Sequence, residues 1–168
     1  MAAPVLGVIG GSGLYSMKDL EVLEEVTVDT PFGAPSDALI RGNLMGREML
    51  FLPRHGVGHR IPPSEINYRA NIFAMKKLGV KRILSVSAVG SMKEEIVPGH
   101  IVLPDQFIDR THRRISTFFS DGIVGHAALA DPICSDLQGK VAEAAQAAGA
   151  TLHVGGTYIC IEGPQFST

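Results

Sequence analysis

The chain has 168 residues, of which 45% are hydrophobic and 19% charged, so it is long and apolar enough to fold as one domain with a core. Its 15 basic and 17 acidic residues give a formal charge of −2, which excludes a strong field for nucleic acid or an anionic membrane. The sequence has no apolar run near the roughly 18 residues of a membrane span and no basic start of a signal peptide. Composition therefore predicts a cytoplasmic protein whose partners are small molecules, with no nucleic acid and no membrane among them.

Short apolar runs in the first third of the chain predict a β-sheet. The first run, residues 5–9, leads directly into a glycine cluster. Three further runs cover residues 22–28, 38–44 and 48–52, and the turns between them contain glycine or proline.

A helix is expected next, with Ser64 as its cap and Gly79 as its end. Its apolar positions fall on one face: Ile66, Ala70, Phe73 and Ala74.

The remainder alternates between strands and one more helix. Strands are predicted over residues 82–88, 99–103 and 152–161, and an alanine-rich helix over residues 136–148. This alternation predicts an α/β fold.

Three of the predicted strand ends carry groups that suit an anion. Residues 10–13 read Gly-Gly-Ser-Gly, and glycine lets backbone N–H groups approach an anion closely. Arg54 and His55 follow another strand, and a guanidinium matches the geometry of phosphate oxygens. Residues 85–91 end a third strand with small hydroxyl side chains. Side by side, these ends would form a phosphate cradle, whereas singly each also fits a structural turn or an ion pair.

The sequence gives little support to other chemistries. It lacks the GxGxxG spacing and the Walker lysine of nucleotide-binding loops. His55 and His59 are four residues apart, but the glycines and prolines around them oppose the helix that a metal pair would need, so no metal is expected. The basic run 110–114 has no interleaved aromatic residues and predicts a solvated or partner-facing loop. Cys134 and Cys160 fit no zinc pattern and are expected to be reduced and buried.

Taken in order, these motifs resemble the trimeric purine-nucleoside phosphorylases, and most closely their methylthioadenosine branch. The resemblance spans essentially the whole chain. It rests on IGGSGL, DTPFG, PS, RHG, NYRAN, SAVGS, DQFIDRT and GTYICIEGPQF, at residues 9–14, 29–33, 35–36, 54–56, 67–71, 87–91, 105–111 and 156–166.

The resemblance implies an α/β fold with a mixed β-sheet flanked by helices, forming a single domain over residues 1–168. The glycine-proline loop at residues 162–168 follows a strand with no packed element after it, so we expect the domain to lack its C-terminal part. The family's acidic residue near the purine, and a methionine against the ribose, belong to a later segment. The resemblance also implies a homotrimer and no cofactor, with inorganic phosphate as co-substrate.

Site residues follow position by position from the same resemblance. It implies a phosphate site made of Ser12, Arg54, His55, Ser87 and the backbone of Ala88, in which Arg54 and His55 are the catalytic candidates.

The substrate would be contacted by three further residues. Phe166 would lie against the purine or ribose, and His126 resembles a residue that a neighbouring subunit lends to the 5′ end of the substrate. Ser167 stands where relatives that cleave 6-oxopurine nucleosides carry a glutamate, which accepts from purine N1–H. Adenine N1 is itself an acceptor, so a serine hydroxyl suits it better. Such a mismatch at a buried polar edge can change discrimination by a factor of about 10⁴.

The implied activity is a pentosyl transfer used in purine and methionine salvage. Phosphate would attack 5′-methylthioadenosine to give adenine and 5-methylthioribose 1-phosphate. The residues show no arrangement for a covalent enzyme intermediate, which fits phosphate as the nucleophile. Two alternatives stay open: the same chemistry on inosine-type nucleosides, and a phosphate- or nucleoside-binding fragment without turnover.

Overall fold

A computed structural model describes residues 6–11, 13–14 and 17–166, and the chain divides into two compact units. Unit 1 comprises Met1–Ala88 and Arg114–Phe118, and unit 2 comprises Val89–Arg113 and Phe119–Thr168. The expectation of one domain over residues 1–168 stays a prediction.

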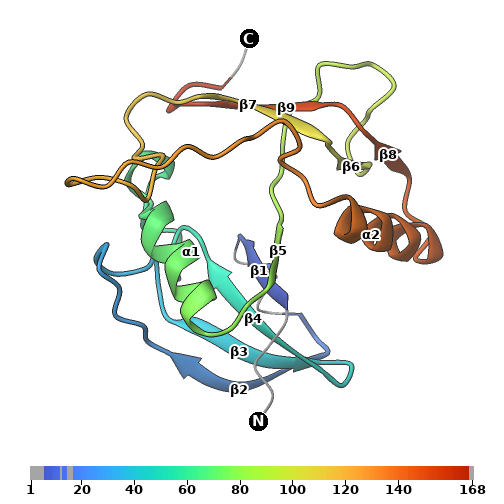
Figure 1. The fold of residues 1–168 in the computed structure, drawn as a ribbon. Coiled ribbons are helices and arrows are strands. Elements are labelled where there is room, and N and C mark those ends of the chain that lie inside the picture. The colour runs from blue at the N-terminus through green and yellow to red at the C-terminus, as the bar shows by residue number, and fades with distance from the viewer. Residues whose placement is uncertain (1–5, 12, 15–16, 167–168) are drawn as a thin grey trace. The chain divides into compact units, whose positions relative to one another are not determined.

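Unit 1 is built on a mixed five-stranded sheet in the order β2-β3-β4-β1-β5 (Figure 1). The two central strands β4 and β1 are parallel, and β5 joins β1 in the same direction, whereas β2, β3 and β4 are antiparallel neighbours. This sheet confirms the predicted mixed α/β class. The strands are β1 Leu6–Gly10, β2 Leu20–Val26, β3 Leu39–Leu44, β4 Arg47–Pro53 and β5 Arg82–Ser85.

Helix α1, Tyr68–Lys77, begins later than the sequence pattern indicated. Its cap is Asn67, whose side chain accepts a hydrogen bond from the N–H of Ala70 at 3.1 Å. The prediction of Ser64 as the cap is wrong, because Ser64 lies in a separate 3₁₀ turn, Pro63–Glu65. Ile66 is extended and separates this turn from the helix. The predicted end is confirmed, since Gly79 follows the helix with φ of +86°.

The core of unit 1 lies between α1 and the sheet. Ala74 and Met75 are fully buried against Leu50 and Leu52 of β4. The helix sits so close to β1 that a Cβ on Gly7 would lie 2.7 Å from the Met75 sulfur. Helix α1 therefore fixes the central strands, whose ends carry the candidate site.

Unit 2 contains two parallel strand pairs and helix α2, Ser135–Ala147 (Figure 1). Strand β6, Ile101–Leu103, pairs with β8, Leu152–Val154. Strand β7, Gln106–Arg110, pairs with β9, Thr157–Ile161.

The prediction of one strand over residues 152–161 is wrong. Gly155 and Gly156 have φ of +93° and +101°, so the chain turns there and changes partners from β6 to β7. Strand β7 was not predicted, and the basic run 110–114 begins at its last residue.

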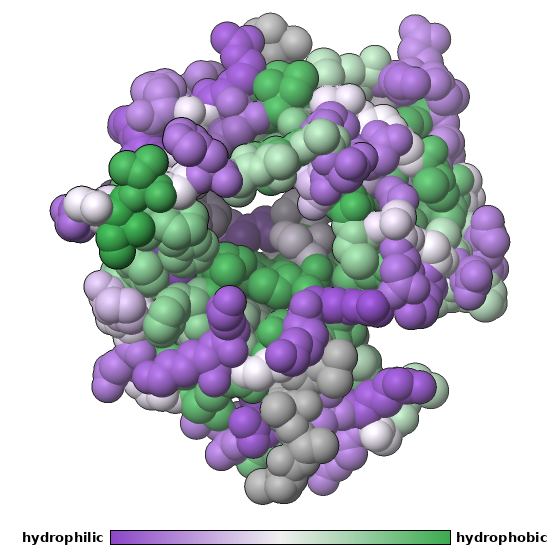
Figure 2. All heavy atoms as spheres, viewed as in Figure 1, coloured by the Kyte–Doolittle hydropathy of each residue, from purple (hydrophilic) through white to green (hydrophobic). Residues whose placement is uncertain are grey.

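Hydrophobic side chains of unit 2 reach the surface in many places. Helix α2 has no buried residue, and hydrophobic patches are visible among polar ones on the molecular surface (Figure 2). Cys134 is exposed and Cys160 partly buried, and both are free thiols, so the expectation of two buried cysteines is wrong for Cys134. Among the described residues, neither helix is long and apolar enough to cross a membrane.

Candidate functional site

The ends of β4, β1 and β5 lie side by side at one edge of the sheet of unit 1. Parallel pairing puts Gly10 opposite Pro53 and Ile9 opposite Ser85. The pairing continues past the strands, since the N–H of Arg54 donates to the Gly10 carbonyl at 3.1 Å and that of Val86 to the Ile9 carbonyl at 2.9 Å. The three strand ends are thus neighbours, as the predicted phosphate cradle requires. They lie at the edge of the sheet where proteins with parallel strands bind ligands.

The Arg54 side chain bridges the ends of β4 and β5. Its Nη1 donates to the Val86 carbonyl at 2.7 Å and to the Ser87 hydroxyl at 3.0 Å, and its Nε donates to Nε2 of His55 at 3.0 Å. Among the described residues these bonds use Nε and Nη1, which leaves Nη2 for an anion. The structure therefore brings together three of the predicted residues: Arg54, His55 and Ser87.

His55 is held as a neutral ring by bonds at both of its nitrogens. Nδ1 faces the Ile61 carbonyl at 2.9 Å and so carries the proton, while Nε2 accepts from Arg54. Burial lowers the pKa of His55, the nearby charges of Arg54 and His59 lower it further, and only the bond to Ile61 opposes them. A neutral His55 is an acceptor that orients the Arg54 guanidinium, rather than a second cation beside it.

His59 stacks on the His55 ring, with centroids 4.1 Å apart and planes 16° from parallel. Among the described residues, no group of three or more His, Cys, Asp and Glu side chains could hold a metal ion. Stacking therefore accounts for this histidine pair.

The remaining predicted site residues are Ser12, Ala88, His126, Phe166 and Ser167. Ala88 is exposed in the segment after Ser87, whereas Ser12 and Ser167 lie outside the described residues. His126 and Phe166 belong to unit 2, where both are exposed, Phe166 by 93%.

Glu162 of unit 2 is a buried carboxylate that sequence reasoning missed. It accepts hydrogen bonds from the N–H groups of His112 and Arg113, at 2.6 and 3.1 Å. The bond from His112 is the main cause that lowers the pKa of Glu162; burial opposes it, and the N–H of Arg113 adds to the lowering. The carboxylate thereby ties the basic run to the segment that leads to Phe166.

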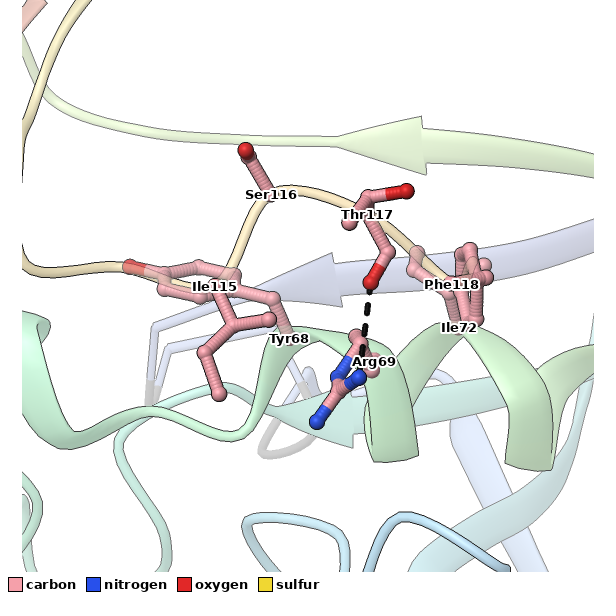
Figure 3. A pocket seen from close by; sticks show the side chains of 7 residues that line it. All are labelled: Tyr68, Arg69, Ile72, Ile115, Ser116, Thr117 and Phe118. Atoms are coloured by element: carbon pink, nitrogen blue, oxygen red, sulfur yellow. Dashed lines mark hydrogen bonds between the residues drawn. The ribbon is translucent and has the colours of Figure 1, made fainter. Parts of the chain in front are cut away.

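A small pocket of about 140 Å³ lies between α1 and residues 115–118 of unit 1 (Figure 3). Arg69 donates to the Thr117 carbonyl at 3.4 Å and lies 4.8 Å from the centre of the Phe32 ring. Phe32 in turn meets Phe118 edge to face, at 5.3 Å between centroids. These contacts anchor the segment on the helix, and their partners are too far apart in sequence to have been predicted.

Comparison with known proteins places the chain in a family. The family model of the phosphorylase superfamily matches residues 5–168, and the chain belongs to that superfamily. Within it, the chain is 66% identical to the S-methyl-5′-thioadenosine phosphorylase of Geobacter sulfurreducens, over 98% of this chain and 58% of the relative.

Two solved structures are similar in fold. A methylthioadenosine phosphorylase from an Antarctic soil metagenomic library is 50% identical with a TM-score of 0.95, over 100% of this chain and 60% of that one. The Schistosoma mansoni methylthioadenosine phosphorylase in complex with adenine is 36% identical with a TM-score of 0.90, over 98% of this chain and 67% of that one. The resemblance and the fold class inferred from the sequence are confirmed. The chain spans less than two thirds of the length of the Geobacter relative.

Proposed function

We propose that this protein catalyses the phosphorolysis of 5′-methylthioadenosine to adenine and 5-methylthioribose 1-phosphate. The observation that carries this proposal is the Arg54 guanidinium, which three hydrogen bonds hold between the ends of β4 and β5, with Nη2 left for an anion. The activities of the similar proteins suggest the substrate, and the site offers a place for the phosphate.

In the proposed reaction, Arg54, Ser87, Ser12 and the backbone N–H of Ala88 bind inorganic phosphate. His55, the fifth member predicted for this site, belongs to it through its bond to Arg54, because its two ring nitrogens are bonded to Arg54 and Ile61. A phosphate oxygen forms a bond to the anomeric carbon as the bond from that carbon to purine nitrogen breaks. The electron pair of the broken bond leaves with the purine, which becomes adenine by taking up the proton that hydrogen phosphate gives up through water. The phosphate anion stabilises the positive charge that develops on the sugar. His55 keeps the guanidinium in place throughout.

We propose that His126, Phe166 and Ser167 contact the nucleoside, with Ser167 selecting the 6-amino purine. We further propose that the protein is a cytoplasmic homotrimer. Exposed hydrophobic side chains of unit 2 support association, because large exposed apolar patches commonly mark interfaces; they include Ile108, Ile123, Val124, Leu129 and Val154.

The test measures base release from 5′-methylthioadenosine, inosine and adenosine, each with and without phosphate, together with the Kd of inorganic phosphate. We expect phosphate-dependent adenine release that is fastest with the thio-nucleoside. Arg54→Ala should abolish it and weaken phosphate binding at least about tenfold, the size of a lost charge-assisted hydrogen bond.

Arg47→Ala is the matched control, because Arg47 is exposed at the opposite end of the same strand. Unchanged phosphate affinity in Arg54→Ala would contradict the site, and a preference for inosine would contradict the role of Ser167.

A further inference from the structure

The loop that carries the site residues, residues 54–61, is here called the Arg54 loop. It has little regular structure: Gly56, Gly58 and His59 have φ of +71°, +78° and +56°. It folds back on itself, since the N–H of Ile61 donates to the His55 carbonyl at 3.0 Å. The Ile61 carbonyl accepts from His55 Nδ1, so the position of this loop decides how His55 and then Arg54 are oriented.

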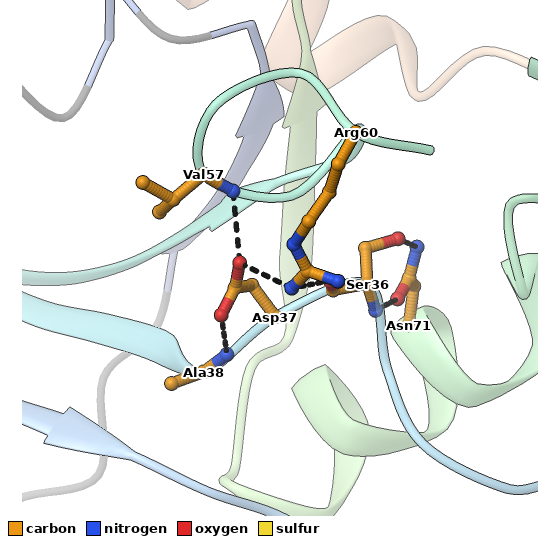
Figure 4. Close-up of polar contacts among 6 residues, drawn as sticks. All are labelled: Ser36, Asp37, Ala38, Val57, Arg60 and Asn71. Atoms are coloured by element: carbon orange, nitrogen blue, oxygen red, sulfur yellow. Dashed lines mark hydrogen bonds and ion pairs between the residues drawn. The ribbon is translucent and has the colours of Figure 1, made fainter. Parts of the chain in front are cut away.

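One carboxylate, that of Asp37, holds the Arg54 loop at two points (Figure 4). Its Oδ2 accepts from the Val57 N–H at 2.8 Å and from Arg60 Nη2 at 2.9 Å, and its Oδ1 accepts from the Ala38 N–H at 3.0 Å. Burial alone would raise the pKa of Asp37, but the bonds from Val57, Arg60 and Ala38 outweigh it and lower that pKa. The carboxylate is therefore ionised at neutral pH.

The Arg60 guanidinium closes the loop over Gly56. A Cβ on Gly56 would lie 3.1 Å from Arg60 Nε and 3.2 Å from Cζ, so the side chain packs directly on this glycine. Arg60 Nη2 also donates to the Ser36 carbonyl at 3.3 Å. The Arg60 side chain is 59% exposed, so its ion pair with Asp37 adds little stability of its own and acts chiefly through geometry.

The segment that carries Asp37 is itself fixed to helix α1. Asn71 accepts from the Ser36 N–H at 2.8 Å and donates to the Ser36 hydroxyl at 2.9 Å, and each residue is 3% exposed. A buried pair of this kind restricts the backbone next to Asp37. The carboxylate is thus supported by a helix rather than by a mobile loop, as a positioning group requires.

We propose that Asp37 is a positioning residue of the anion site: through Val57 and Arg60 it fixes the Arg54 loop, which holds His55 and, through it, the Arg54 guanidinium. The inference rests on the proposed function for the identity of the anion, inorganic phosphate. In this proposal Asp37 does not touch the anion. Its carboxylate forms an ion pair with Arg60 rather than with Arg54.

The test compares the 168-residue chain with Asp37→Asn, which keeps the shape of the side chain and removes its charge. Asp19→Asn is the matched control, since it makes the same change at an exposed position of unit 1. Two quantities are measured on folded protein: the titration of His55 by NMR of its ring nitrogens, and the Kd of inorganic phosphate.

In Asp37→Asn we expect His55 to titrate closer to its ordinary pKa and phosphate to bind about tenfold more weakly, the scale of one hydrogen bond to a charged group. In Asp19→Asn both quantities should match the parent. The proposal would be overturned if Asp37→Asn had lower thermal stability but the same His55 titration and the same phosphate Kd as the parent. That result would show a purely structural role for Asp37.

The two proposals fail in different ways. If the parent chain binds no phosphate, the proposed function is wrong, and the His55 titration still decides whether Asp37 orients the pair. If circular dichroism shows that Asp37→Asn is unfolded, Arg60→Gln is used instead. Arg60 is exposed, and this substitution removes one of the two contacts between Asp37 and the Arg54 loop. It should move both quantities in the same direction, and parent values would overturn the proposal.

Discussion

Asn71→Ala should destabilise the protein strongly, because it breaks a buried pair of hydrogen bonds with Ser36. The change removes the acceptor of the Ser36 N–H and the donor to the Ser36 hydroxyl, at 2.8 and 2.9 Å, from a site that is 3% exposed. Each buried polar group left unsatisfied costs about 1–3 kcal/mol. The hydroxyl can rotate toward another acceptor, so we expect a loss of about 2–4 kcal/mol in the free energy of unfolding.

The assay is urea unfolding followed by circular dichroism, with the loss taken from the change in midpoint at constant slope. Asn43→Ala is the control: it lies in β3 of the same unit, and among the described residues its Oδ1 is buried without a hydrogen-bond partner. Removing that oxygen should change the free energy of unfolding far less. A loss below about 0.5 kcal/mol in Asn71→Ala, the range of ordinary surface substitutions, would refute the reasoning.

Two further predictions concern stability. Since the pKa of His55 is lowered in the folded protein, the unfolded chain takes up the proton first, and stability should fall as pH drops below about 6.5. The free energy of unfolding of the parent and of His55→Gln is measured at pH 7.5 and at pH 5.5. The parent should lose more stability than the variant between the two pH values, and an equal difference between the two proteins at both would contradict the prediction. Gly7→Ala should cost about 1–3 kcal/mol, because its Cβ would lie 2.7 Å from Met75. Gly139→Ala, inside α2 with nothing within 4 Å, should instead raise stability by about 0.5–1 kcal/mol; thermal melts that show the same sign for both would count against the packing argument.

Local patterns sufficed for the elements whose signals lie within a few residues. Buried runs located β1 and β4, and Gly79 located the end of α1, because strand burial and a glycine stop are short-range properties. The helix start was missed because Pro62 and Pro63 precede a 3₁₀ turn that takes in Ser64, so the cap is Asn67, a residue type that caps helices as well as serine does.

Unit 2 shows where such patterns fail. Its stretch over residues 152–161 reads as one apolar run, and only the different partners of residues 152–154 and 157–161 reveal that it is two strands. The exposed pattern of β7 gave no periodic signal for a strand.

The candidate site divides in the same way. Arg54 and Ser87 were found because each follows a strand, and parallel strand ends meet at one edge. The supports of the site were not found, because Ser36 and Asn71 are 35 residues apart and only the fold joins them. Asp37 resembles any loop carboxylate until Val57 and Arg60 are brought to it.

The break between β8 and β9 has a mechanical consequence for unit 2. Hydrogen bonds continue across it, since the Gly155 N–H donates to the Leu103 carbonyl at 2.9 Å and the Asp105 N–H to the Gly156 carbonyl at 3.1 Å. The two strand pairs therefore behave as one bent ladder. An inserted residue in either strand at the bend would shift one side of the ladder against the other and turn the following side chains to the opposite face. Glu162, the first residue after β9, would lose its alignment with His112. An insertion in one strand of a pair must therefore be matched by an insertion in its partner strand.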